Sequence, residues 1–72
     1  MEEARGDKFK RLAEKRMKVT LRQIQLIANL SNRNNYEYSD DEVKKIFSAL
    51  YSEVRAAEQS FKLKLRETNF KL

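Results

Sequence analysis

Basic side chains are the residues of this sequence whose type and spacing could do chemistry. The 72 residues include 16 lysines and arginines against 11 aspartates and glutamates, a net charge of +5. Residues 1–33 hold nine of the bases and four of the acids, whereas residues 34–72 hold seven of each. A local excess of positive charge attracts phosphate groups. The residues that we expect to contact phosphate are Lys8, Arg11, Lys15, Lys18 and Arg22.

The pattern of bases does not specify a nucleic-acid sequence. The bases are spread around the expected helix, and no helix-turn-helix or basic-zipper pattern is present. We therefore expect contacts mainly with backbone phosphates of DNA or RNA. A small nucleotide is a second option, with arginines on its phosphates and Tyr36 or Phe9 stacked on its base between chains of an oligomer. The structural alternative is that the bases form a solvated face.

Catalysis is not expected. The chain has no cysteine and no histidine, so the commonest nucleophile and general base are absent, and there is no disulfide or zinc site. Asp40, Asp41 and Glu42 form the acid cluster, but a helix start explains them better than magnesium does. No glycine-rich loop is present, since Gly6 is the one glycine. We expect no enzyme, no cofactor and no metal.

The stretch LSNRNNYEYSDDE, residues 30–42, interrupts the apolar periodicity with asparagines and tyrosines. Because glycine is missing here, we expect one of Asn32, Asn34 and Asn35 to end the first helix in the left-handed conformation. Arg33, Asn35 and Tyr36 are the candidates for contact with a ligand or partner. The alternative for Tyr36 is that it folds back over the end of the core.

Two long helices must position these residues. No proline interrupts the chain, and we expect helices over residues 7–31 and 39–67, a loop over 32–38 and a frayed tail over 68–72. Ser39 and Glu42 have the spacing of a capping box, with Tyr38 and Val43 at hydrophobic-staple spacing. The predicted fold is all-α, a single domain over residues 1–72 that forms a coiled-coil-like antiparallel two-helix hairpin stabilised by homo-oligomerisation.

The apolar residues of the first helix form two faces. The seam of the second helix is spaced four and three and consists of Val43, Phe47, Leu50, Val54, Ala57 and Phe61. We expect it to pack on Ala13, Met17, Leu21, Ile24 and Ala28. The other face, which consists of Leu12, Val19, Leu26 and Leu30, then remains for a second copy of the chain or for a host protein.

The runs FKRLAEKR and IQLIANLSNRNNYEYSDDEVKKIFSAL resemble a group of short bacterial and mobile-element proteins. The shared core is Asn-Leu-Ser-Asn, then Asn-Tyr-Glu-Tyr followed by Ser or Thr, and the resemblance extends from about Phe9 to Phe61. It implies a helical hairpin and a phage or plasmid origin, and it implies no activity.

These observations predict a small, basic, non-enzymatic protein. We expect an accessory or regulatory factor that binds nucleic acid or a nucleotide as an oligomer. The alternative is a protein-interaction module, an inhibitor or adaptor such as a counter-defence factor, that uses the apolar face of the first helix. No apolar run is long enough to span a membrane, and the charged N-terminus does not resemble a signal peptide. The expected location is the cytoplasm.

Overall fold

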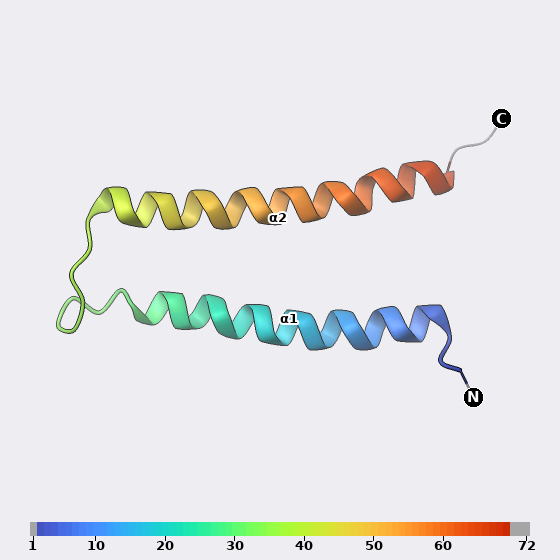
Figure 1. Ribbon diagram of the computed structural model, residues 1–72, viewed down its shortest axis with the longest axis horizontal. Coiled ribbons are helices and arrows are strands. Elements are labelled where there is room, and N and C mark those ends of the chain that lie inside the picture. The colour runs from blue at the N-terminus through green and yellow to red at the C-terminus, as the bar shows by residue number, and fades with distance from the viewer. Residues whose placement is uncertain (1, 70–72) are drawn as a thin grey trace. The chain divides into compact units, whose positions relative to one another are not determined.

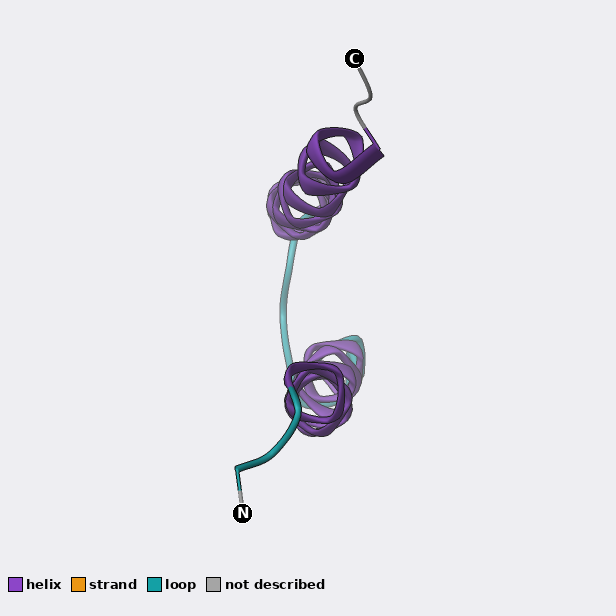
Figure 2. Ribbon diagram, turned by 90° about the vertical axis from the view of Figure 1, so that its right-hand side faces the viewer, coloured by secondary structure: helices purple, strands orange, loops and turns teal. Residues whose placement is uncertain are grey.

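The computed structural model describes residues 2–69 and the side chains of residues 2–65. It contains helix α1 (Arg5–Asn29) and helix α2 (Asp40–Asn69), each continuous, and no strand among the described residues (Figures 1 and 2). The chain divides into two units, Met1–Glu37 and Tyr38–Leu72, and each contains one helix. The prediction of an all-α protein with two long helices is confirmed.

Helix α1 begins at Arg5, two residues before the predicted start. Ala4 precedes it in an extended conformation, and its carbonyl accepts a hydrogen bond of 2.9 Å from the Lys8 N–H. Gly6 is a weak helix former, yet it lies in the first turn, where Asp7 favours the positive end of the helix dipole. A glycine at this position therefore does not delay the helix.

Helix α1 ends at Asn29, two residues before the predicted end. The prediction that an asparagine ends this helix in the left-handed conformation is wrong. No described residue has a positive φ. Leu30 remains right-handed at φ −70° and ψ −9°. The N–H groups of Leu30 and Ser31 donate to the carbonyls of Ile27 and Ala28, each at 3.0 Å. The last turn thus tightens into hydrogen bonds between residues three apart, which satisfy free carbonyls without a left-handed residue.

Asn32 organises the turn that follows. Its Oδ1 accepts a hydrogen bond of 3.0 Å from the Asn34 N–H. Its carbonyl accepts from the N–H groups of Asn35 at 3.1 Å and Tyr36 at 3.0 Å. A side-chain oxygen that bonds the backbone two residues on imitates a backbone turn. The structural role of Asn32 is therefore to form this turn, not to end α1 in the left-handed conformation.

The capping box at the start of α2 is confirmed. The Glu42 N–H donates to Ser39 Oγ at 3.1 Å, and the Ser39 N–H donates to Glu42 Oε1 at 2.9 Å. Tyr38 and Val43 are both half-buried, as a hydrophobic staple requires. At its other end α2 continues through Asn69. The helix therefore extends two residues past the predicted end at residue 67, and residues 70–72 of the predicted frayed tail lie outside the described residues.

Both helices leave their apolar side chains accessible. Of the side chains that the structure describes, none is buried, and the predicted core residues are exposed or half-buried. A helix of one turn every 3.6 residues cannot cover its own apolar face. The antiparallel hairpin and its oligomer therefore stay predictions. Within the described part of the chain, neither helix combines the length and apolarity needed to cross a membrane.

Candidate functional site

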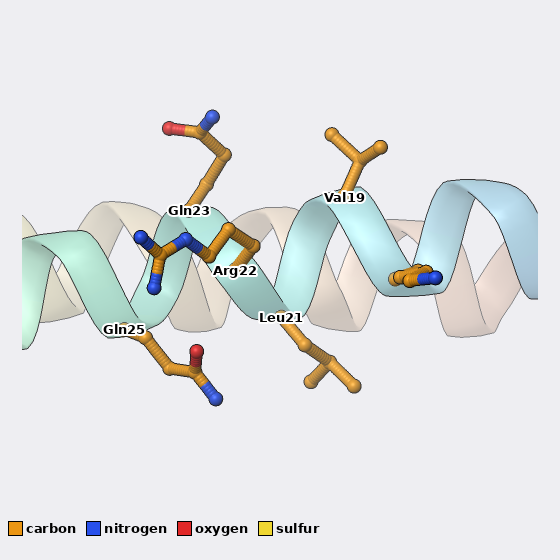
Figure 3. Close-up of a pocket in the computed structure, with 6 residues that line it drawn as sticks. Val19, Leu21, Arg22, Gln23 and Gln25 are labelled. Atoms are coloured by element: carbon orange, nitrogen blue, oxygen red, sulfur yellow. The ribbon is translucent and has the colours of Figure 1, made fainter.

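A surface hollow lies on α1. The residues that line it are Lys18, Val19, Leu21, Arg22, Gln23 and Gln25. They form three pairs spaced four residues apart, and such pairs lie one above the other on a helix. Figure 3 shows Val19 and Gln23 projecting from one side of the helix, Leu21 and Gln25 from the opposite side, and Arg22 between them. The hollow is thus open and shallow, with Lys18 and Arg22 in the arc between the two sides, and we call it the trough.

Lys18 and Arg22 give the trough its electrostatic character. Both are exposed, and neither has an ion pair or hydrogen bond among the described residues. Two like charges one helical turn apart repel each other. An anion placed between them relieves that repulsion and gains two attractive contacts. A guanidinium holds phosphate through two parallel hydrogen bonds, and an ammonium adds a point charge.

The side chains that flank Lys18 and Arg22 add a second kind of chemistry. Val19 and Leu21 expose 55% and 51% of their surface, which leaves apolar area beside the cations. The amides of Gln23 and Gln25 supply donors and acceptors. The trough therefore suits a ligand that combines a phosphate with an apolar or aromatic body. Neither glutamine was predicted to line a site, although Gln23 lies four residues after Val19 and Gln25 four residues after Leu21.

The five predicted phosphate contacts lie on one strip of α1. Their spacing is three, four, three and four residues, so on a continuous helix they fall within an arc of about 80°. Lys10 and Arg16 lie roughly 80° outside this arc, one on each side. We expected the bases to be spread around the helix, and five of the eight in α1 lie within this arc instead. We call Lys8, Arg11, Lys15, Lys18 and Arg22 the basic strip.

One member of the basic strip, Arg11, forms an ion pair with the Glu3 side chain. Arg11 Nε donates to Glu3 Oε1 and Oε2 at 3.2 and 3.0 Å, and Arg11 Nη2 donates to Oε1 at 3.0 Å. The Glu3 carboxylate raises the pKa of the Arg11 guanidinium above its usual value through this hydrogen bonding. Both side chains remain partly exposed. Glu3 was not predicted, because its spacing from Arg11 is not that of a helical pair.

The loop candidates lie apart from the residues that line the trough. Arg33, Asn35 and Tyr36 follow α1 in the turn that Asn32 organises, and Tyr36 exposes 48% of its surface. The hydrogen bonds of the Asn35 and Tyr36 N–H groups fix the backbone of the turn. Contact of these three residues with a ligand or partner stays a prediction.

The predicted oligomer face borders the trough. Val19 belongs to both, whereas Leu12, Leu26 and Leu30 do not line the trough. Leu12 is half-buried, and Leu26 and Leu30 are exposed. A ligand in the trough would therefore lie beside whatever covers this face.

The chain matches no family model, no curated protein and no solved structure. The resemblance to short mobile-element proteins therefore stays a prediction, and so does the origin that it implies.

Proposed function

We propose that this protein is a non-enzymatic binding protein for a phosphate-bearing ligand, either nucleic acid or a nucleotide. The observation that carries the proposal is the trough on α1, in which Lys18 and Arg22 lie one turn apart without an ion pair among the described residues. In biological terms it is an accessory or regulatory factor of a phage or plasmid, in keeping with the resemblance of its sequence.

The binding is driven by charge. Lys18 and Arg22 hold a phosphate between them, and Lys15 continues the positive field toward the start of α1. Each phosphate that a cation neutralises releases condensed counterions, which makes the affinity strongly dependent on salt. Gln23, Gln25 and the apolar side chains beside them contact the remainder of the ligand, so they orient it without selecting a base sequence.

The proposal includes an assembly. We infer that α1 and α2 pack as an antiparallel hairpin and that hairpins associate into a homo-oligomer. Support comes from the apolar seam of α2 and the two apolar faces of α1, whose described side chains are exposed or half-buried. A single helical hairpin formed by these 72 residues buries only a small apolar core. Covering three apolar faces requires more helical partners than one hairpin provides.

A titration with matched variants tests the proposal. Fluorescence anisotropy would follow binding of arbitrary single-stranded DNA, RNA and a labelled nucleoside triphosphate at low and high salt. The double variant Lys18→Gln, Arg22→Gln is compared with Lys10→Gln, Arg16→Gln, which removes the same charge outside the basic strip.

We expect the trough variant to lose affinity and to flatten the salt dependence for single strands by about 1.4 logarithmic units per decade, the value for two lost phosphate contacts. The control double variant should retain most of the affinity. Equal losses in both variants would mean that only net charge matters, and no binding at low salt to any of the three probes would refute the proposal.

A second candidate function is protein binding through the apolar face of α1. The face made of Leu12, Val19, Leu26 and Leu30 is accessible along α1, and contiguous accessible apolar surface is typical of protein interaction sites. A host protein could bind it with an amphipathic helix, which would make the chain an inhibitor or adaptor. Such a complex should barely weaken between low and high salt, whereas a phosphate complex weakens steeply.

A further inference from the structure

We propose that the basic strip of α1 is a track for a linear polyanion and that Glu3 is an internal competitor that occupies one position of the track. This inference rests on the proposed function and narrows it to a ligand class. The ligand is a chain of several phosphates, such as an extended single strand, rather than a compact nucleotide.

The length of the basic strip favours a chain of phosphates. Lys8 and Arg22 are 14 positions apart in one continuous helix, which corresponds to about 21 Å at ~1.5 Å per residue. A hydrogen bond reaches only about 3 Å, so a single phosphate contacts one or two neighbouring cations and leaves the others without a partner. A phosphate backbone that runs along the helix engages them in turn.

The contact between Glu3 and Arg11 resembles the contact that a phosphate makes. The carboxylate faces the guanidinium with three N–O distances of 3.0 to 3.2 Å. Carboxylates and phosphates use the same paired geometry on arginine. Glu3 therefore holds the position that a phosphate takes when the ligand extends past Lys15 toward Lys8.

Glu3 is suited to exchange with a ligand. It precedes the helix, and its partner is eight residues away, twice the longer spacing of ordinary helical pairs. The relative exposures of the two side chains are 56% for Arg11 and 37% for Glu3. Accessible ion pairs contribute little to stability and are screened by salt. A ligand with several phosphates displaces Glu3 by its many other contacts, whereas a ligand with one phosphate does not.

The test uses the full chain and labelled oligothymidylates of about two and about twelve nucleotides, lengths on either side of the shortest nucleotide sites of single-strand binding folds. The variant is Glu3→Gln. Glu2→Gln is its matched control, because it removes the same charge one residue away and Glu2 has no interaction among the described residues. Circular dichroism verifies that both variants keep the helicity of the native chain.

We expect the longer strand to bind more tightly than the shorter one and with a steeper salt dependence. Compared with Glu2→Gln, Glu3→Gln should increase the affinity for the longer strand two- to fivefold. It should also steepen the slope of log affinity against log salt concentration by about 0.7, the value for one more phosphate contact on a single strand. Arg11→Gln added to Glu3→Gln should abolish that gain.

Three results overturn the inference, and they differ from one another. Equal affinity and equal salt dependence for both lengths would refute the track and leave phosphate binding intact. Equal effects of Glu3→Gln and Glu2→Gln would refute the competitor. No binding of either strand or of a nucleoside triphosphate would refute the proposed function itself.

Discussion

Replacing Ser39 by alanine removes one half of the capping box that begins α2. The N–H groups of the first turn of a helix have no partner within the helix. Ser39 Oγ satisfies the one on Glu42 at 3.1 Å, and Glu42 returns the bond to the Ser39 N–H at 2.9 Å. Ser39→Ala removes the first bond directly and leaves Glu42 less firmly held for the second.

The expected cost is about 1 kcal/mol in the free energy of unfolding. For a chain of this size that corresponds to a decrease of about 4–8 °C in the melting midpoint. Ser39→Asp keeps an acceptor at the cap and should stay close to the native value. Ser52→Ala is the matched control, because Ser52 is exposed in the interior of α2. Alanine there should leave stability unchanged or raise it by about 0.5 kcal/mol.

Thermal melts followed by far-ultraviolet circular dichroism measure these differences. All variants must be compared at one protein concentration, because self-association makes the midpoint depend on concentration. If Ser39→Ala and Ser52→Ala melt at the same temperature as the native chain, the capping box does not stabilise α2 and the reasoning from its geometry is refuted.

Two further predictions concern stability and assembly. Leu26→Asp should reduce the oligomer to monomers or unfold it, because burying a carboxylate against apolar side chains costs free energy. Size-exclusion chromatography with light scattering measures the mass, and an unchanged mass with unchanged helicity would contradict the prediction. Asn32→Ala should lower stability by about 0.5–1.5 kcal/mol through loss of the 3.0 Å bond from the Asn34 N–H, whereas Asn34→Ala keeps that donor and should be close to neutral in a chemical denaturation experiment.

The start of α2 was predictable because its determinants are local. Ser39 and Glu42 are three residues apart, and the two bonds between them depend on nothing else in the chain. The ends of α1 were each misplaced by two residues. Gly6 is tolerated in a first turn, and Leu30 and Ser31 close the helix with backbone N–H bonds that any residue except proline can make.

The candidate site was predictable only in its charged part. Lys18 and Arg22 follow from the local excess of bases, and the trough includes both. Gln23 and Gln25 carry no charge and take part in no motif, so only the helical geometry identifies them. Glu3 could not be paired with Arg11 from spacing, because the pair depends on the path of the chain before α1.

We propose that several copies of this chain together hold a phosphate-bearing ligand through the trough on α1. Native mass spectrometry of the purified protein, combined with its ultraviolet absorbance at nucleic-acid wavelengths, tests it most directly. We expect a multiple of the chain mass together with the mass of a phosphate-bearing ligand, and loss of that ligand in the double variant Lys18→Gln, Arg22→Gln. A single chain that binds neither nucleic acid nor nucleotide at low salt would contradict both the assembly and the binding.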